Sequence, residues 1–544
     1  MITAATRQPK ASASGTLRCR ILNRFSDLEA LAPQWERLWS RDPGKEIFQH
    51  FGWVRAWMRA FGKDHGLFTP VVYDGEDVVA ILPLVECRQE LRFIGYSASD
   101  YNALLCGPEF AAEALALALD TLFGGGPRHW KNVVLENVRE DAGLSQAVAK
   151  LPVRWRRLIQ MSRPTPCPTL ILGEAKEQLL AGILSKDKVK KTCKTILRLG
   201  DLGFRHLDSA AEIRAHLPRF AEQHISRCVL DGRQSQFLRG DYTSFCEYLT
   251  ENLDPARQIR FSLLEISGKP VAYHFGFEVD GRYLYYKPVF DIDLWDYSPG
   301  QVLLFKIFES FRESDIREFD LGQGGEPYKS RYSNACRENL TFTVYPPGIA
   351  GQVMRACGAA ATTARGWGRV TIDRHPNLQA LGNRIEAAAA RWRRRSLTER
   401  GAESSVYALP DAVEPGVDLG LRPIALRALA QHAAHEPGFL TAAELHSIRH
   451  CLKKGDTVYA DRECRCVVLA SRTAVAETAA GPVDLGGTGL VFTVLHEAAG
   501  NRPALIQAMT EIAARLGMAG WLVSSRAEPG LKSPIVSGQG GGAR

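Results

Sequence analysis

The stretch 261–345 limits what this chain can fold into more than any other part of it. An apolar run rich in β-forming residues (261–266) comes first, and two further runs flank Asp280-Gly281, a dipeptide typical of a tight β-hairpin turn. Residues 298–310 then predict an apolar-periodic helix with Pro at its start, where a missing N–H costs nothing. Another short strand is predicted to end at the glycine-rich run 322–325. This order predicts a mixed α/β domain whose helix start could bind an anion.

Several segments carry a resemblance to a known family. A helix with six basic residues (186–198) precedes the strands, SPGQVLLFKIFES (298–310) lies in the middle, and FDLGQGGEPYKSRY (319–332) closes the unit. This order resembles the GNAT acyltransferases. More narrowly, it resembles the CelD-like acetyltransferases of bacterial polysaccharide synthesis, which are relatives of the FemAB-type peptidyl transferases. The segments 47–62 and 70–86 are similar to the entry helix and first hairpin of that family.

The resemblance implies tandem GNAT-like domains with mixed central sheets flanked by helices, followed by a smaller C-terminal α/β module. The first half repeats the element order of the second, which suggests an internal duplication. The Pro-rich joint 163–169 separates the halves, because its prolines cannot sustain regular hydrogen bonding. The predicted parts are a disordered leader (1–15), an N-terminal GNAT-like domain (16–165), a catalytic GNAT-like domain (166–350), a basic helical segment and linker (351–419), a degenerate GNAT-like module without a glycine-rich loop (420–530) and a disordered tail (531–544).

Two helix starts show capping-box spacing. Ser26 with Glu29 and Ser209 with Glu212 place a hydroxyl and a carboxylate three residues apart before apolar-periodic runs. We therefore expect a helix over 26–39 and a second, longer helix from residue 209 onward.

Composition excludes several protein classes. A chain of 544 residues is too long for one core, and 45% hydrophobic with 24% charged residues predicts a soluble globular protein. No apolar run approaches the roughly 18 residues that a membrane helix needs. The twelve cysteines form no CxxC pair and no Cys/His cluster, which predicts reduced thiols in the cytoplasm and no metal site. The formal charge of +8 is mild and selects no class of partner.

The start of the helix at 298–310 is the predicted donor site. Gly300 would let a diphosphate approach the N–H groups of Gln301 and Val302, with Ser298 beside it, because a side chain there would block that approach. An ordinary turn before a helix is the alternative. By the resemblance, the diphosphate belongs to acetyl-CoA or another acyl-CoA, which acts as co-substrate.

The predicted catalytic residues come from the strands and from the DxGxGxxxYK ending. Asp320 ends a strand where α/β sheets place ligand-binding residues, and it could be a base, an acceptor ligand or only a turn cap. By the resemblance, Lys329 holds an anionic group of the acceptor or the developing oxyanion, and Tyr328 protonates the leaving thiolate. His274, in the middle of an apolar strand, is the leading candidate for the general base and Asp291 the next, although a core histidine is the usual reading.

Two basic segments have no assigned partner. The lysine-rich helix 186–198 is typical of a solvated face, and an anionic ligand is favoured over nucleic acid, because no recognition motif accompanies it. The arginines of 391–395 could touch an anionic membrane surface or a synthesis complex, although so few charges make a weak anchor.

These patterns favour an acyl-CoA-dependent acyltransferase that modifies an amine or hydroxyl. The resemblance implies a sugar or polysaccharide precursor as the acceptor, and no metal. A FemAB-type aminoacyl transferase acting on a cell-wall precursor is one alternative, although it calls for a long helical arm for the tRNA. A non-catalytic binding or scaffold subunit of a polysaccharide synthesis complex is the other.

Overall fold

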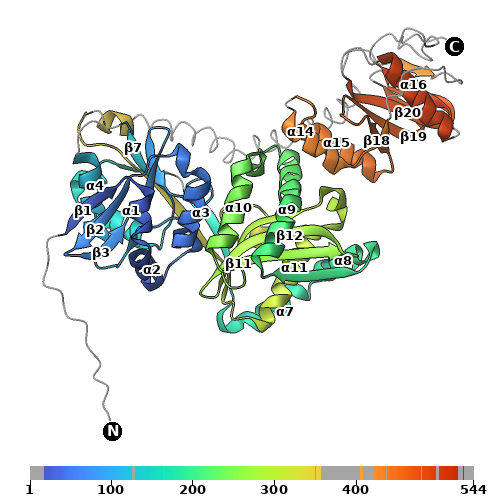
Figure 1. Cartoon of the computed structure of the whole chain (residues 1–544). Coiled ribbons are helices and arrows are strands. Elements are labelled where there is room, and N and C mark those ends of the chain that lie inside the picture. The colour runs from blue at the N-terminus through green and yellow to red at the C-terminus, as the bar shows by residue number, and fades with distance from the viewer. Residues whose placement is uncertain are drawn as a thin grey trace, which may run out of the picture. The chain divides into compact units, whose positions relative to one another are not determined.

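The computed structural model describes residues 17–124, 129–162, 164–349, 351–356, 405–408, 421–436, 438–478, 481–497, 502–516, 518–524 and 531. The predicted leader, the basic segment around 391–395 and the tail after residue 531 lie outside the described residues. The chain divides into two compact units (Figure 1). The first unit is Met1–Pro218, Gly240–Pro288 and Tyr297–Gly368, and the second is Arg219–Arg239, Val289–Asp296 and Arg369–Arg544. We call residues 17–162 of the first unit its N-terminal half, and the residues of this unit from 164 to 349 its C-terminal half.

The first unit contains fifteen strands among its described residues. They are β1 (Arg18–Leu22), β2 (Thr69–Asp74), β3 (Asp77–Ile81), β4 (Leu84–Cys87), β5 (Glu90–Phe93), β6 (Leu105–Cys106), β7 (Asn132–Arg139), β8 (Ile159–Met161), β9 (Thr165–Ile171), β10 (Leu202–Leu207), β11 (Ile259–Ile266), β12 (Lys269–Val279), β13 (Arg282–Phe290, which ends in the second unit), β14 (Glu318–Asp320) and β15 (Ala335–Val344). Four of them form the sheet β1-β2-β3-β6. The other eleven form one sheet of order β10-β11-β12-β13-β14-β9-β15-β7-β5-β4, with β8 paired to β15.

The helices of this unit pack on both sheets. They are α1 (Phe25–Glu29), α2 (Ala32–Arg41), α3 (Phe51–Phe61), α4 (Ala111–Gly124), α5 (Gly143–Lys150), α6 (Val153–Arg156), α7 (Lys176–Leu184), α8 (Asp187–Ile196), α9 (Ala210–Leu230, shared with the second unit), α10 (Gly240–Asn252) and α11 (Pro299–Ser310). Figure 1 shows α4 lying against β1, β2 and β3, and α11 against β11 and β12. Helices α7 and α8 contact α11, and α3 of the N-terminal half contacts α10 of the C-terminal half.

Each half contains one parallel strand pair that encloses a helix. In the N-terminal half β5 pairs with β7, and α4 lies between them in sequence. In the C-terminal half β13 pairs with β14, and α11 lies between them. A parallel connection needs such a crossover helix, and the further neighbours of β5, β7 and β14, which are β4, β15 and β9, are antiparallel. The two halves therefore contain the same strand–helix–strand unit, and the internal duplication stays a prediction.

The predicted Pro-rich joint is a strand, so the expectation that it lacks regular hydrogen bonds was wrong. β9 pairs with β14 on one edge and with β15 on the other. Pro166 and Pro168 stand two residues apart, so their backbone groups face the same edge. On that edge their carbonyl groups accept hydrogen bonds from the N–H groups of Gly324 (2.9 Å) and Leu321 (3.1 Å). The missing N–H groups also fall on that edge, and none is required from the pairing with β15.

The two capping-box predictions have different outcomes. The Ser209 hydroxyl accepts a hydrogen bond from the Glu212 N–H at 3.2 Å, and α9 begins at the next residue, as predicted. The single helix expected over 26–39 was wrong, because α1 ends at Glu29 and α2 begins at Ala32 with a proline at the start of its first turn. Proline cannot continue a helix from the preceding turn but fits the first turn of a new one. Ser26 lies inside α1, whose N-cap is Arg24.

The second unit contains its own mixed sheet, of order β16-β21-β20-β19-β18-β17. Its strands are β16 (Ser405–Ala408), β17 (Arg422–Pro423), β18 (Thr457–Ala460), β19 (Cys466–Thr478), β20 (Gly481–Glu497) and β21 (Gly520–Ser524), and its helices include α14 (Leu426–His435), α15 (Ala442–Lys453) and α16 (Arg502–Arg515). β20 and β21 are parallel and enclose α16 in sequence, which is the arrangement of α4 and α11 again. One core cluster contains buried side chains of α14 and α15, and another contains those of α16.

Candidate functional site

The C-terminal half has a fork where its parallel strands diverge. β13 and β14 pair over three positions, and the last of them joins Leu284 to Asp320. β14 ends there, whereas β13 continues for six residues, to Phe290. The chain after Asp320 turns into the loop 321–328, which we call the glycine loop. Asp320 is therefore the last paired residue before the strands separate, and the carboxyl ends of parallel strands are where α/β folds place ligands.

Asp320 is buried, with 6% of its surface exposed. Its Oδ1 accepts hydrogen bonds from the Tyr101 hydroxyl (2.8 Å) and from the Gly322 N–H (2.7 Å). Burial, and secondly the negative charge of Glu46, raise the pKa of Asp320 to about 7, although both hydrogen bonds act in the opposite direction. A carboxylate with this pKa can take up a proton near neutral pH, which is the property that general-base catalysis needs.

Lys329 follows the other end of the glycine loop, and its side chain is buried, including the ammonium group. The ammonium contacts the carbonyl groups of Gly322 (3.4 Å) and Gln323, and it pairs with Glu326 Oε2 at 2.9 Å. An ammonium has three hydrogen atoms to donate, and these contacts use them. Lys329 therefore fastens the glycine loop beside Asp320. To bind an acceptor anion or an oxyanion, as predicted, it would have to release one of these partners.

The glycine loop approaches the N-terminal half closely. Gly322 and Gly324 have φ angles of 71° and 114°, which favour glycine. A Cβ atom on Gly322 would lie 3.1 Å from Asp100 Oδ2. The Asp100 carbonyl accepts hydrogen bonds from the side-chain amides of Gln323 (2.7 Å) and Asn339 (2.8 Å). Loss of hydration raises the pKa of Asp100 to about 6, against the charges of Lys287 and Lys329.

Asp100 and Tyr101 are site residues that the sequence analysis missed. They follow β5 in the N-terminal half, which we expected to be separate from the catalytic half. The sequence offered only a weak signal, because Asp100 lies in the polar run 97–102 between the strand that ends at Phe93 and the next short strand. Nothing in the sequence, however, shows that the two strand ends meet.

The predicted donor residues lie at the start of α11, but two of the N–H groups there already donate hydrogen bonds within the protein. Ser298 is the N-cap in a left-handed conformation (φ 53°), and Pro299 follows it. The N–H groups of Gln301 (3.0 Å) and Val302 (3.2 Å) both donate to the Ser298 carbonyl. The second of these is the first regular bond of the helix. A diphosphate bound as predicted would have to share the Gln301 N–H with Ser298 and compete for that of Val302, and Gly300 leaves room beside them.

His274 is not brought to the Asp320 cluster. Its ring stacks on Tyr285 with ring centroids 4.4 Å apart, and Tyr285 also packs against Phe319. Phe319 and Asp320 are consecutive residues of β14, so their side chains point to opposite faces of the sheet. His274 therefore lies on the face opposite to Asp320.

The His274 ring is fully buried, and burial holds its pKa well below the ordinary value. Its Nδ1 lies 3.2 Å from the Tyr283 hydroxyl, and Nε2 has no hydrogen-bond partner among the described residues. The Tyr283 hydroxyl continues to Ser262 Oγ (3.3 Å), which lies 3.0 Å from His206 Nδ1. The imidazole is thus neutral and held within the sheet.

The remaining predicted residues occupy other positions. Tyr328 precedes Lys329 at the end of the glycine loop and is partly exposed. Asp291, in the second unit, forms ion pairs with Arg219 (2.9 Å) and Arg427. The lysines of α8 are exposed, whereas Val189 and Ile196 of that helix are buried. In the described part of the chain, no group of three or more His, Cys, Asp or Glu side chains could hold a metal ion.

A network of ion pairs joins the two halves beside the fork. Glu46 of the N-terminal half pairs with Arg139, at the end of β7, and with Arg282, at the start of β13. Arg139 also binds Asp141 at 2.7 Å, and Arg337 of β15 pairs with Glu318 of β14. These side chains are mostly buried, and charged groups in that setting persist when they are paired and hydrogen-bonded.

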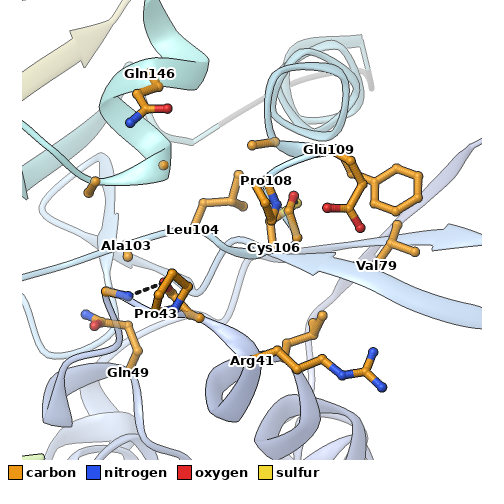
Figure 2. Close-up of a pocket in the computed structure, with 18 of the residues that line it drawn as sticks. Arg41, Pro43, Gln49, Val79, Ala103, Leu104, Cys106, Pro108, Glu109 and Gln146 are labelled. Carbon is orange, nitrogen blue, oxygen red and sulfur yellow. Dashed lines mark hydrogen bonds between the residues drawn. The ribbon is translucent and has the colours of Figure 1, made fainter. Parts of the chain in front are cut away.

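A cleft of about 920 Å³ opens in the N-terminal half, and we call it the N-terminal cleft. Figure 2 shows Arg41 and Pro43, at the end of α2, on one side of it, and Pro108 and Glu109, just before α4, with Gln146 of α5 on the other. Its lining also includes Glu46, Gln49, Tyr101 and Arg139. Tyr101 therefore belongs both to this cleft and to the Asp320 cluster.

Residues 185–330 match the model of a family described as acetyltransferase (GNAT) domain. The match covers less than half of the chain and includes α8, the hairpin, α11, the fork and the glycine loop. The chain thus contains a GNAT acyltransferase domain within a mixed α/β fold, and the predicted fold class is confirmed. Domains of this family use acyl-CoA. The narrower CelD-like assignment stays a prediction.

Solved structures with a similar arrangement include FemX, with 10% identity and a TM-score of 0.40 over 58% of this chain and 96% of that chain. A tandem GNAT protein from the clavulanic acid biosynthesis pathway has 14% identity and a TM-score of 0.37, over 61% of this chain and 100% of that chain. The C-terminal domain of a putative lysylphosphatidylglycerol synthetase from Agrobacterium fabrum has 12% identity and a TM-score of 0.38, over 60% of this chain and 96% of that chain. At these values the similarity says nothing about activity. No curated protein matches the chain. Among the described residues, no helix is both long and apolar enough to cross a membrane.

Proposed function

We propose that this chain transfers an acyl group from acyl-CoA to an amine, and that the reaction takes place at the fork in the C-terminal half. The observation that carries this proposal is the coincidence of the family match with the fork. Residues 185–330 contain both α11, whose start is the predicted donor site, and Asp320, the buried carboxylate at the point where β13 and β14 separate.

The donor is expected at the start of α11. Ser298 and Gly300 present backbone rather than bulky side chains there, and no acidic residue stands in the first turn of the helix. The helix dipole and the N–H groups of residues 300–302 favour a diphosphate at this position, to the extent that the bonds to Ser298 can be shared. The acyl thioester would then lie along β13 toward the fork.

The chemistry requires a proton acceptor close to the attacking nitrogen. The amine nitrogen forms a bond to the acyl carbon, the C–S bond breaks, and its electron pair leaves with the sulfur of CoA. The nitrogen must lose a proton in this process, and Asp320 is the candidate base because it stands at the fork, while burial raises its pKa to about 7. Tyr328 is the candidate that returns a proton to the thiolate.

Calorimetry with acetyl-CoA and longer acyl-CoAs tests the donor part of the proposal. We expect micromolar binding by the full chain and loss of that binding in Gly300→Trp. The matched control is Gly182→Trp, because Gly182 is an exposed helical glycine whose Cβ would meet no atom within 4 Å. If the full chain binds no acyl-CoA, the proposal fails, and the aminoacyl-transferase and scaffold alternatives take its place. Equal loss in both variants would show misfolding and not a donor site.

A further inference from the structure

The N-terminal cleft has the size and the composition of a ligand site. Its volume of about 920 Å³ lies at the upper end of the range of small-molecule pockets. Several separate elements supply its walls: the end of α2, the strand β3, the residues before α4, the segment 101–104, and the end of β7 with the start of α5. In Figure 2 the side chains of Val79, Cys106 and Glu109 lie on the same side of the hollow, toward β3 and the start of α4.

Negative charge dominates the lining. Six carboxylates stand against three guanidinium groups: Asp42, Glu46, Asp74, Asp77, Glu109 and Asp141 against Arg37, Arg41 and Arg139. The buried Arg139 is neutralised by Glu46 and Asp141. Of the others, Asp42, Asp74, Asp77 and Glu109 form no ion pair among the described residues, and neither do Arg37 and Arg41. Burial, and then the charges of Glu109 and Asp42, raise the pKa of Cys106 to about 12.

The inner wall of the cleft touches the reaction site. Tyr101 lines the cleft, is 2% exposed, and donates its hydroxyl hydrogen to Asp320. Gln49, also in the lining, fixes this part of the chain by donating from its side-chain amide to the Tyr101 carbonyl at 2.8 Å. A molecule that fills the cleft would therefore have its inner end next to the Tyr101–Asp320 pair.

We propose that the N-terminal cleft binds the acyl acceptor, and that this acceptor is a polycationic amine. The inference rests on the proposed function, because it supplies the second substrate of the same reaction. Unpaired carboxylates around the cleft attract a molecule with several ammonium groups and repel phosphorylated ones. Polyamines and oligomers of amino sugars both have this chemistry. A nucleotide-linked sugar does not.

The transfer step balances with the groups present. An ammonium group of the acceptor reaches the inner wall and loses one proton to Asp320, whose carboxylate form the Tyr101 hydroxyl stabilises by its hydrogen bond. The free amine attacks the acyl carbon, the C–S bond breaks, and CoA leaves as the thiolate. The product nitrogen then gives up its second proton to solvent, Tyr328 protonates the thiolate, and Asp320 releases its proton to solvent while Tyr328 regains one. The other ammonium groups of the acceptor stay paired with carboxylates of the cleft.

Binding without any donor tests this inference independently of the acyl-CoA site. Titration calorimetry would compare spermidine, a glucosamine trimer and UDP-N-acetylglucosamine on the full chain. The test variant is Asp77→Asn with Glu109→Gln, two exposed side chains in the cleft lining. The matched control is Glu113→Gln, because Glu113 is exposed on α4 one turn beyond Glu109 and is absent from the lining.

We expect one or both cations to bind, with the Kd raised about tenfold in the double variant and unchanged in the control, and no binding of the nucleotide sugar. The cation that binds more tightly, and that releases CoA when acetyl-CoA is added, identifies the source of the acceptor. Two outcomes overturn the inference: equal cation binding by the double variant and the wild type, or binding of the nucleotide sugar in preference to both cations. Either could occur while acetyl-CoA still binds, so the donor site and the cleft fail or stand separately.

Discussion

Each half encloses one helix between its parallel strands, and these two helices, α4 and α11, differ most at their first residues. α11 starts with Pro299-Gly300 after a left-handed Ser298, and its first turn has no acidic side chain. α4 follows Gly107-Pro108-Glu109 and has Glu113 in its first turn. The carboxylates near the start of α4 interact favourably with the dipole of that helix, and they would repel a diphosphate. The start of α11 has no such carboxylates. In our proposal, the same strand–helix–strand unit therefore has two uses: it binds an anionic donor in the C-terminal half and a cationic acceptor in the N-terminal half.

The largest effect is expected at the carboxyl end of the second strand of each parallel pair, where Asp320 is the last residue of β14 and Asp141 lies two residues after β7. Asp320→Asn removes the proton acceptor, so kcat should fall by roughly 10²–10⁴ while acetyl-CoA binding stays unchanged. Its counterpart after β7 is Asp141→Asn, which should raise KM for the amine and leave kcat within about twofold. Steady-state kinetics on both variants checks this contrast. Similar kcat values for the two would remove the functional difference between the halves.

The next test compares the replacement of one glycine at each predicted ligand site. Gly300→Trp should abolish acyl-CoA binding and spare amine binding, and Gly107→Trp should do the reverse, because Gly107 lines the N-terminal cleft. We expect a loss of about 30-fold or more at the affected site, since an indole would occupy the space of the ligand. Calorimetry with each substrate alone gives four numbers. If both variants lose the same ligand, the assignment of one substrate to each half is incorrect.

A smaller effect is expected for Tyr101, the residue that links the halves at Asp320. A base must be unprotonated, so kcat should rise with pH through about 7, the pKa of Asp320. Tyr101→Phe removes a hydrogen bond that favours the carboxylate form, so the inflection should move to higher pH, and kcat at pH 7 should fall about tenfold. A full pH–rate profile of both proteins measures the shift. An inflection that stays in place would show that Asp320 is not the titrating group.

The smallest effect concerns stability, and the two carboxylates should differ in sign. The folded-state pKa of Asp320 is raised, so its contribution to stability is present below the unfolded value near 4 and is lost as pH rises through about 7. Burial alone would raise the pKa of Asp141, but hydrogen bonds and charge from Arg139 lower it, so its contribution is present above about 4 and lost in acid.

At pH 8, Asp320→Asn should therefore raise Tm by a few degrees, about 2–4 °C, and Asp141→Asn should lower it slightly. At pH 4, both differences should shrink. Differential scanning calorimetry at the two pH values separates the cases, and a lower Tm for Asp320→Asn at pH 8 would contradict the sign given for Asp320.

Local patterns in the sequence predicted the parts of the fold that depend on neighbours along the chain. Asp280-Gly281 has both φ angles positive (48° and 71°), as a tight hairpin turn between β12 and β13 requires. Ser209 caps α9. These features need only a few consecutive residues, so the sequence contains all of their determinants.

Features that depend on distant residues were not predictable. The strand β9 is stable despite Pro166 and Pro168 because the chain past β14 supplies donors to one edge and β15 pairs on the other. Asp320 was identified as a site residue from its place at the end of a strand, but its partner Tyr101, and Asp100 beside the glycine loop, lie more than 200 positions earlier. His274 looked like a base by position, and only the alternation of Phe319 and Asp320 shows that it lies on the other face of the sheet.

The place of β15 in the large sheet has a consequence for synthesis on the ribosome. β7 of the N-terminal half pairs with β15, through contacts such as Val133 with Val344, and β9 pairs with β15 as well. The N-terminal half therefore cannot complete its sheet until residues 335–344 have left the exit tunnel. Until then the nascent chain exposes an unpaired edge of β7, which is apolar at Val133, Val134 and Leu135. Chains that stop before β15 should aggregate, and folding of this protein should depend on chaperones that cover nascent strand edges.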